Sequence, residues 1–322
     1  MIKKAYNKLI EKIGERIPSG RQPLGNVGWM PKNIPAGIKL IKNKKKFLDK
    51  IFKHTVYRIN HFGKIPDERG LLKIELKDSG MKFIVPETLG ALTDLGIINE
   101  IFRKKKERLD GDYFWNKKKK KLYEIGEDDI VVDIGGHRGY FSCFAAKLAK
   151  SGKVYSFEPS NYDCELLRKN EMLNKIGDNL EIYNAGILKS PNIKTLNIDN
   201  VGSGGNTLIG SKRKTQLAEF YSLAQLIESK KGSKIESDKI KKIDFLKIDT
   251  EGSEFDILES PDWVFKGKKE IGYLGVKHIS MEVHEWMVSG KDKVSYLINK
   301  LSSLGYDVTF DANISILYAD KK

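Results

Sequence analysis

Residues 131–142 read VVDIGGHRGYFS: a short apolar strand runs into an acid, a glycine-rich turn and the start of a helix. The spacing excludes two phosphate-binding motifs. A P-loop requires Lys and then Ser or Thr after its last glycine, whereas Tyr140 and Phe141 follow Gly139. The dinucleotide fingerprint Gly-x-Gly-x-x-Gly requires a glycine at position 134, which is Ile134. The stretch therefore predicts a cofactor loop that does not hold a phosphate.

The same stretch matches Asp-x-Gly-x-x-x-Gly, a pattern of S-adenosylmethionine (SAM) sites. Asp133, Gly135 and Gly139 supply the pattern, and Gly136 and Tyr140 lie beside them. SAM has no pyrophosphate, so an acid at the turn attracts its ammonium or sulfonium charge, where it would repel a diphosphate. Glycines let the backbone close against the methionine and ribose parts. We expect these five residues to bind the cofactor.

The next two strands add three candidate cofactor-binding residues. Glu158 ends the strand VYSFE, where a carboxylate accepts hydrogen bonds from both ribose hydroxyls. Asn184 and Ala185 end the third strand, where the adenine edge is expected to pass.

From residue 126 onward, strands and helices alternate as in a parallel sheet that is covered on both faces. The turn before the last strand is too short for a parallel crossover, so the last two strands are expected to be antiparallel neighbours. A helix is expected near residues 216–229. The fold class is therefore α/β, a doubly wound, Rossmann-like and mostly parallel sheet with an antiparallel C-terminal hairpin, as in class I methyltransferases. The strands are expected at residues 129–134, 153–159, 180–185, 243–249, 278–284, 306–310 and 315–319.

The chain divides near residue 125 into a basic N-terminal α+β region (1–125) and a catalytic domain (126–322). The first part carries a net charge of +16 and the second part −1, so the whole excess of +15 comes from the first part. Its lysine-rich runs are expected to attract an anionic substrate or a membrane surface, unless they only solvate the protein. In chain order the region is expected to contain an amphipathic helix at 2–17, an irregular connector at 20–37, a β-hairpin at 71–86 and a helix at 93–106.

The composition favours a cytoplasmic protein, with peripheral association at a membrane as an alternative. No apolar stretch approaches the roughly 18 residues of a membrane span, and the N-terminus has no signal-peptide core. Cys143 and Cys164 fall in expected helices without metal-binding spacing, so we interpret both as buried apolar residues.

Four sequence blocks together resemble the FkbM family of SAM-dependent methyltransferases, over roughly residues 120–285. Glycine at 136 and histidine at 137 depart from the alanine and asparagine usual there. The resemblance implies an O-methyltransferase acting on a hydroxyl of a sugar, a lipid or a polyketide-type metabolite. The blocks are VVDIGGHRGYFS (131–142), VYSFEPSNYDCELLRKN (154–170), IDFLKIDTEGSEFDIL (243–258) and ISMEVH (279–284).

Catalytic candidates follow the fourth and fifth strands of the expected sheet. The crevice of an open α/β sheet lies beyond the carboxyl ends of its strands, which brings Asp249, Glu251 and His284 toward the methyl group. An alcohol needs a base during attack, and histidine has the better-matched pKa, with Asp249 orienting it or binding the acceptor. Glu282 and Lys247 are expected to support them. No metal is assigned, although Asp249, Glu251 and His284 offer an alternative as ligands of a divalent cation.

Two other functions stay open. One is an RNA methyltransferase that holds phosphates with the basic N-terminal region, although the sequence DTEG (249–252) is not the Asn/Asp-Pro-Pro-Tyr motif of enzymes that methylate base nitrogens. The other is an inactive protein that binds membrane surfaces and retains the methyltransferase fold. The sequence identifies neither the acceptor nor the oligomeric state.

Overall fold

The structure is a computed structural model, and the amphipathic helix expected at residues 2–17 lies outside the residues that it describes. These residues divide into two compact units, one up to Arg103 and one from Lys104 onward. The domain boundary near residue 125 stays a prediction. The described residues are 34–48, 50–51, 70–87, 90–105, 108–109, 111–116, 118, 120–198, 205–209, 214–223, 225, 242–260, 275–284 and 293–322.

The first unit contains the predicted β-hairpin, which is confirmed. Strand β1 (Leu71–Glu75) pairs antiparallel with β2 (Lys82–Pro86), and alternate residues of β1 are buried. Two helices, α2 (Ile34–Leu40) and α4 (Gly90–Phe102), pack together, and α4 also contacts β2. Helix α2 begins at Ile34, so it includes residues 34–37 of the expected connector.

Two short hairpins lead into the large sheet of the second unit. A helix was expected to continue to residue 106, but α4 ends at Phe102 because residues 104–105 form strand β3. The first hairpin pairs β3 (Lys104–Lys105) with β4 (Arg108–Leu109), and the second pairs β5 (Trp115–Asn116) with β6 (Lys121–Leu122).

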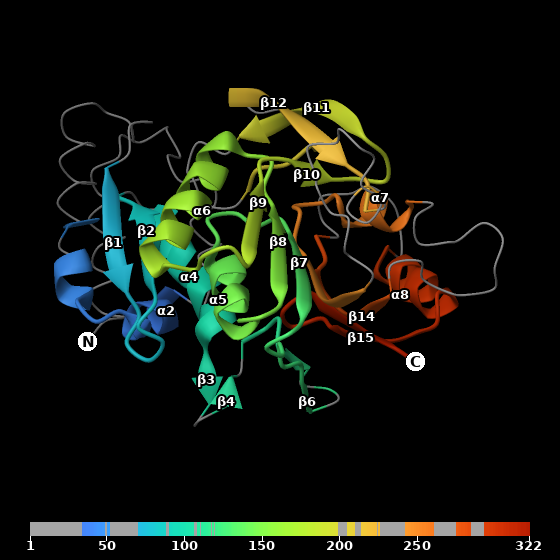
Figure 1. Cartoon of the computed structure of the whole chain (residues 1–322), viewed down its shortest axis with the longest axis horizontal. Helices are drawn as coiled ribbons and strands as arrows, with labels where there is room; N and C mark the ends of the chain where they lie inside the picture. The colour runs from blue at the N-terminus through green and yellow to red at the C-terminus, as the bar shows by residue number, and fades with distance from the viewer. Residues whose placement is uncertain are drawn as a thin grey trace, which may run out of the picture. The chain divides into compact units, whose positions relative to one another are not determined.

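The second unit is built on a seven-stranded sheet (Figure 1). Its order is β15-β16-β14-β13-β7-β8-β9, and β16 runs antiparallel to both of its neighbours while the other pairs are parallel. The predicted α/β class, parallel core and antiparallel terminal hairpin are therefore confirmed. The strands are β7 (Ile130–Ile134), β8 (Lys153–Phe157), β9 (Leu180–Tyr183), β13 (Ile243–Ile248), β14 (Val276–Glu282), β15 (Tyr306–Asp311) and β16 (Ile316–Lys321).

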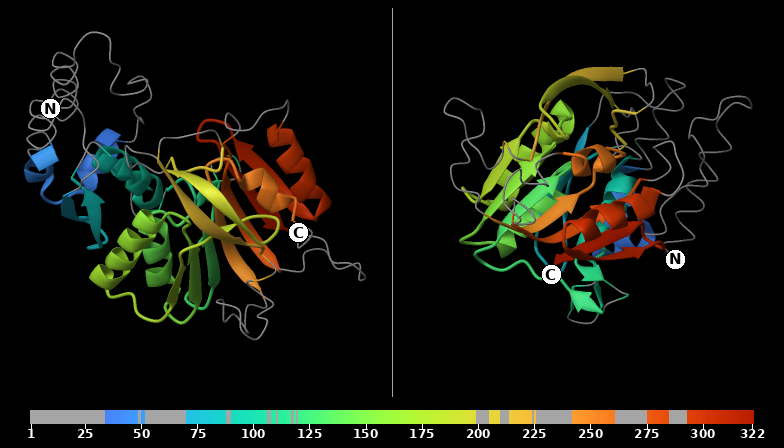
Figure 2. Two further views of the ribbon diagram at one scale, coloured as in Figure 1. Left: turned by 90° about the horizontal axis from the view of Figure 1, so that it is seen from above. Right: turned by 90° about the vertical axis from the view of Figure 1, so that its right-hand side faces the viewer.

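Helices cover both faces of this sheet. Helices α5 (Tyr140–Leu148) and α6 (Asn161–Asn174) lie together on one face, and α7 (Glu254–Leu258) and α8 (Lys293–Ser303) lie on the other (Figure 2). All six residues of β13 are buried, because the strand is central and covered on both sides. Both cysteines are free and buried, on α5 and α6, as predicted. None of the helices in the described part of the chain has the length and apolar character of a membrane span.

A separate three-stranded sheet corrects one prediction. Strand β12 (Lys214–Tyr221) lies between β10 (Gly186–Ile187) and β11 (Asn192–Ile198), so the helix expected near residues 216–229 is wrong over residues 216–221. Ala218 and Phe220, two residues apart, are buried with Leu196 of β11 in one cluster. This period of two is that of a strand, and pairing with β11 satisfies the backbone.

Candidate active site

The loop after β7 lies tightly against the end of β13. A Cβ atom at Gly135 would lie 1.7 Å from the carbonyl oxygen of Asp249, and the φ of Gly135 is +85°, so only glycine fits. The amides of Gly135 and Gly136 both donate to the carbonyl of Phe157, at 3.0 and 2.9 Å. At Gly136 a Cβ would approach Ser156 Oγ to 2.2 Å, which explains why the alanine usual in the resembled family is absent.

The charge of Asp133 is paired inside the protein, and the direct contact with the cofactor expected for it stays a prediction. Its side chain is fully buried, and Ser142 Oγ and Lys247 Nζ donate to its two carboxylate oxygens at 2.5 and 3.2 Å. The ammonium group of Lys247 also donates to the carbonyl of Gly135 and lies 3.3 Å from Asp249 Oδ2. Burial opposes the charge of Lys247, but the carboxylates of Asp133 and Asp249 hold its pKa above the usual value. Asp133 therefore acts on the loop through Lys247.

Glu158 lies at the tip of β8, where the sequence places the acid that binds ribose. Its Oε2 accepts from the amide of His137 at 2.8 Å, and its Oε1 accepts from the amide of Ser160 at 2.8 Å. These two bonds aim the carboxylate at the glycine loop. Burial and the neighbouring charge of Asp163 raise the pKa of Glu158 to about 8, despite both amide donors.

His137 offers a polar group that the protein leaves unsatisfied. Its side chain is 15% exposed, and neither ring nitrogen has a hydrogen-bond partner among the described residues. The backbone is left-handed, with a φ of +49°. Burial and the charge of Arg138 lower the pKa of His137 to about 4, so the ring is neutral. Its Nε2 lies 3.8 Å from Asp163 Oδ1, and buried ring nitrogens without a hydrogen bond among the described residues, beside a glycine loop, fit a site for a polar cofactor.

The other predicted cofactor residues surround this loop. Gly139 has a φ of +79° and precedes α5, and Tyr140 and Ala185 are 1% and 2% exposed. Asn184 is exposed, and its amide donates to the carbonyls of Glu158 and Pro159. The loops after β7, β8 and β9 thus meet at one edge of the sheet, and together with Glu158 and His137 they fit SAM. Direct contact of each residue with the cofactor stays a prediction.

The acids after β13 and the histidine after β14 form one cluster. The Nδ1 of His284, a residue that is 3% exposed, lies 2.9 Å from Oε1 of Glu254. Its Nε2 faces three carboxylates, Asp249, Glu251 and Glu282, at 3.9, 3.7 and 3.8 Å. The three predicted catalytic residues therefore lie together.

Glu254 is the first residue of α7, where an acid interacts favourably with the helix dipole, but its side chain also bonds to groups outside the helix. Its Oε1 also accepts from the amides of Thr250 and Gly252, at 3.1 and 3.2 Å, and from the hydroxyl of Thr250 at 3.0 Å. The fully buried Glu254 thus connects the turn after β13 to His284.

Tyr113 is a site residue that sequence reasoning missed. Its hydroxyl lies 2.9 Å from both Asp249 Oδ2 and Glu282 Oε2, and the residue is 2% exposed. The single phenol proton of Tyr113 is therefore shared between two carboxylate acceptors. The pairs span 136 and 169 residues, so no local pattern signals them.

Glu251 is held in a strained conformation at the rim of this cluster. Its φ is +52°, a left-handed value that costs a non-glycine residue on the order of 1 kcal/mol or more. The hydroxyl of Thr207, a buried residue, donates to the carbonyl of Glu251 at 2.8 Å and holds the turn. Burial raises the pKa of Glu251 to about 8.

The charges around His284 change its expected role. Burial alone would lower the pKa of the imidazole, but the hydrogen bond with Glu254 and the charges of Glu254, Glu251 and Glu282 raise it to about 10. With only these protein groups around it, His284 carries a proton at neutral pH. An imidazolium cannot accept the acceptor's proton, so the base role predicted for His284 does not suit this arrangement.

The strand order, the glycine loop and the acid at the tip of the second parallel strand define a class I methyltransferase. The model of the Methyltransferase FkbM domain matches residues 133–308, which is more than half of the chain. The chain therefore belongs to the FkbM methyltransferase family, as the sequence blocks indicated, and the family implies SAM as the cofactor.

Individual relatives are distant. The "Methyltransferase 1" of Beauveria bassiana (strain ARSEF 2860) is 21% identical over 158 residues, which cover 44% of this chain and 63% of that relative. The methyltransferase FkbM of Methylobacillus flagellatus KT is 13% identical, with a TM-score of 0.40 over 62% of this chain and 45% of that one. The Methanococcus jannaschii fibrillarin pre-rRNA processing protein is 12% identical, with a TM-score of 0.36 over 79% and 98%. Scores this low add no support to the assignment.

The raised pKa of Glu158 predicts that SAM affinity depends on pH. Ribose hydroxyls donate to the ionised carboxylate, so binding favours the form without a proton. Because that pKa is about 8, we expect affinity to rise roughly tenfold per pH unit up to pH 8 and then to level off. Titration calorimetry from pH 6 to 9 measures the profile. Glu158→Gln is the control, because it keeps every other titrating group, the amine of SAM included. It should bind SAM weakly, and its affinity should change less with pH. Equal slopes of affinity against pH for both proteins would contradict the ribose-binding role of Glu158.

Proposed function

We propose that the protein is a SAM-dependent O-methyltransferase that acts on a hydroxyl of a sugar, a lipid or a small metabolite. The observation that carries the proposal is a cluster of oxygen acceptors directly against the cofactor loop. The amide of Asp249 donates to the carbonyl of Ile134 at 2.9 Å, which joins the acidic turn to the strand that leads into the glycine loop. Carboxylates of Asp249, Glu251 and Glu282 there favour a hydroxyl donor as the acceptor substrate.

Glu251 is the acid we propose as the proton acceptor. Among the described residues no group donates a hydrogen bond to its carboxylate, whereas Tyr113 and Lys247 hold Asp249, and Tyr113 also reaches Glu282. The side chain of Glu251 is 25% exposed, so an acceptor hydroxyl can reach it. In its ionised form, which predominates above its pKa of about 8, Glu251 is thus the carboxylate of this cluster that can take a proton without breaking a hydrogen bond.

The reaction then follows from the positions of these groups. Bound SAM supplies a methyl carbon activated by its sulfonium. Asp249 and Glu282 orient the acceptor hydroxyl, whose oxygen forms the new carbon–oxygen bond as the carbon–sulfur bond breaks and its electron pair stays on sulfur. Glu251 takes the hydroxyl proton, which balances the charges. His284, held by Glu254, stabilises the carboxylates on both sides.

Glu251→Gln tests this role. We expect the turnover number to fall by roughly 10²–10⁴-fold, because the amide cannot accept the proton, while SAM affinity stays within about threefold. Labelled SAM with a ¹³C-methyl group and a panel of sugars, lipids and extract fractions gives the acceptor, and NMR shows whether the methyl group lies on oxygen. Glu165→Gln on α6, which removes an exposed acid paired with Lys169, is the control. Methyl groups found only on nitrogen or carbon would contradict the proposal.

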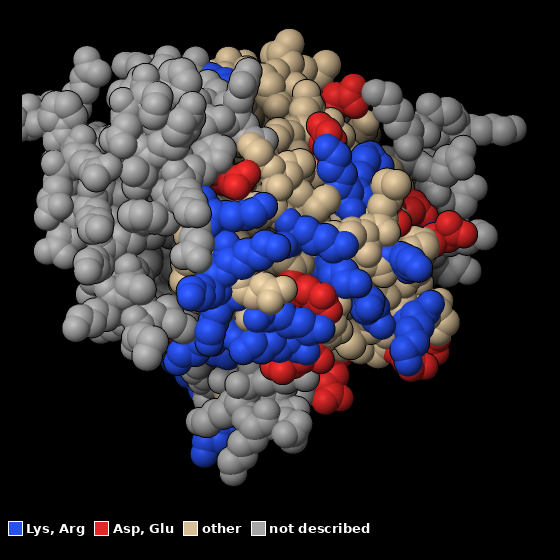
Figure 3. Space-filling model, turned by 90° about the vertical axis from the view of Figure 1, so that its left-hand side faces the viewer, with Lys and Arg blue, Asp and Glu red and all other residues tan. Residues whose placement is uncertain are grey.

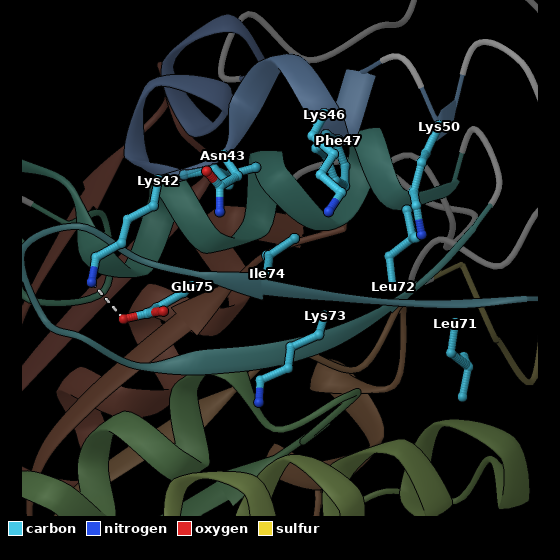
Figure 4. A pocket seen from close by; sticks show the side chains of 11 residues that line it. Lys42, Asn43, Lys46, Phe47, Lys50, Leu71, Leu72, Lys73, Ile74 and Glu75 are labelled. Carbon is cyan, nitrogen blue, oxygen red and sulfur yellow. Dashed lines mark hydrogen bonds and ion pairs between the residues drawn. The ribbon is translucent and has the colours of Figure 1, made fainter.

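We also propose that the basic N-terminal region binds the anionic headgroups of a membrane surface. In the first unit a hollow of about 360 Å³ lies between β1 and the helical residues 44–48. Lys42, Lys46, Lys50 and Lys73 line it (Figure 4), and Lys42 pairs with Glu75 at 2.5 Å. The other three lysines form no ion pair with any described residue. Figure 3 shows Lys and Arg side chains gathered on the face that it presents.

The double variant Lys46→Glu/Lys50→Glu tests this surface. Each lysine near an anionic membrane contributes about 1 kcal/mol, so we expect at least a tenfold loss of binding to vesicles that contain phosphatidylglycerol. Lys150→Glu/Lys169→Glu changes the net charge equally at exposed sites of the second unit. Vesicle flotation at physiological salt measures both. Equal losses in the two variants, or no flotation of the wild type, would contradict the proposal.

A further inference from the structure

The cluster at the carboxyl ends of β13 and β14 has the donor set of a metal site. Asp249, Glu282 and His284 each offer one ligand atom, and the three atoms lie within 4.8 Å of one another. Two carboxylate oxygens and one imidazole nitrogen suit a divalent cation such as Mn²⁺ or Mg²⁺. The residues come from two adjacent parallel strands, so the sheet fixes their spacing.

The distances from His284 to two carboxylates are those expected for groups that share one ion. Its Nε2 lies 3.9 Å from Asp249 Oδ1 and 3.8 Å from Glu282 Oε1, which is too long for hydrogen bonds. Two donors that each lie about 2.1 Å from one ion are separated by roughly 3–4.2 Å. The observed distances fall in this range.

The surroundings of His284 orient it as a ligand. Oε1 of Glu254 lies 2.9 Å from Nδ1, on the opposite side of the ring from the three carboxylates. A carboxylate that accepts from the second nitrogen of a metal-binding histidine fixes its tautomer and ring plane. Glu254 is fully buried, and its Oε2 has no hydrogen-bond partner in the described part of the chain. Four carboxylates lie within 3.9 Å of this one imidazole, and a bound cation would offset their mutual repulsion.

We infer that Asp249, Glu282 and His284 bind a divalent cation that holds the acceptor oxygen, with Glu254 and Tyr113 orienting the ligands. The role of the cation rests on the proposed O-methyl transfer, whereas binding itself does not. The ion lowers the pKa of the coordinated hydroxyl, whose proton passes to Glu251 before the oxygen attacks the methyl carbon. The ligand set differs from the alternative suggested by the sequence, because Glu282 replaces Glu251.

Titration of the full-length chain with Mn²⁺, followed by calorimetry and electron paramagnetic resonance, tests the site without an acceptor. We expect one saturable Mn²⁺ site per chain, at least about tenfold weaker in Glu282→Gln and in Asp249→Asn. The exposed Glu165→Gln should stay within about threefold of the wild type. SAM affinity and thermal unfolding of each variant show that the protein is folded.

Three results would overturn the inference: no saturable Mn²⁺ site in the wild type, unchanged affinity in a folded Glu282→Gln, or an equal loss in Glu165→Gln. SAM binding and methyl transfer that persist after chelation would show that the reaction needs no cation, and the proposed function would still hold. A Mn²⁺ site in a protein that binds no SAM would instead support the cation site and contradict the proposed methyl transfer.

Discussion

Lys247→Met should destabilise the second unit by about 3–5 kcal/mol, because it leaves the fully buried carboxylate of Asp133 without its cation. The side chain of Lys247 is 4% exposed and lies 3.2 Å from Asp133 Oδ1 and 3.3 Å from Asp249 Oδ2. Its ammonium also donates to the carbonyl of Gly135, so its loss should loosen the cofactor loop as well. Urea unfolding followed by circular dichroism measures the change.

Two further proteins control this prediction. Lys153→Met breaks an exposed ion pair with Glu181, of length 2.9 Å, and should cost no more than about 1 kcal/mol. The double variant Lys247→Met/Asp133→Asn removes one buried charge of each sign, so it should be more stable than Lys247→Met alone. Equal effects of Lys247→Met and Lys153→Met would show that the buried pair does not hold the fold.

Gly135→Ala should abolish SAM binding while the sheet stays folded. The new methyl group would lie 1.7 Å from the carbonyl oxygen of Asp249, so the loop must move away from β13. That movement would carry the amides of Gly135 and Gly136 away from the carbonyl of Phe157. Loss of SAM binding by more than about 100-fold in calorimetry, with a native circular dichroism spectrum, is the expected result.

Gly177→Ala separates backbone strain from the clash. Gly177 has a φ of +82°, close to the +85° of Gly135, but no atom lies within 4 Å of its added Cβ. It should cost about 1 kcal/mol of stability and leave SAM affinity unchanged. A Gly135→Ala protein that binds SAM like Gly177→Ala would contradict the close packing of the loop on β13.

Local patterns predict those parts of the site that single segments build. Gly135, Gly139 and Glu158 sit at strand ends that follow from apolar runs and turns, so their meeting at one edge follows from the fold class. Asp133 follows the same pattern, yet its partner Lys247 is 114 residues away. Its position at the strand end was predictable, but its ion pair with Lys247 was not, because the pair joins two distant segments of the chain.

The catalytic cluster shows the same limit. Asp249, Glu251 and His284 were placed together by the order of the strands, whereas Tyr113 and Thr207 reach them from segments outside the core strands. The pKa of His284 depends on the carboxylates of Glu254, Glu251 and Glu282, which tertiary structure brings around it, so its residue type alone could not indicate its protonation state. Sequence patterns identify candidates, and tertiary packing sets their charges.

Calorimetry of SAM with the wild type and with Glu158→Ala tests the central claim most directly. The carboxylate of Glu158 is expected to accept two ribose hydroxyls, and hydrogen bonds to a charged group contribute about 1.5–3 kcal/mol each. We predict one SAM site per chain in the wild type and an affinity at least about 100-fold lower in Glu158→Ala. A wild-type protein that binds no SAM, or a folded Glu158→Ala protein that binds it equally well, would contradict the account.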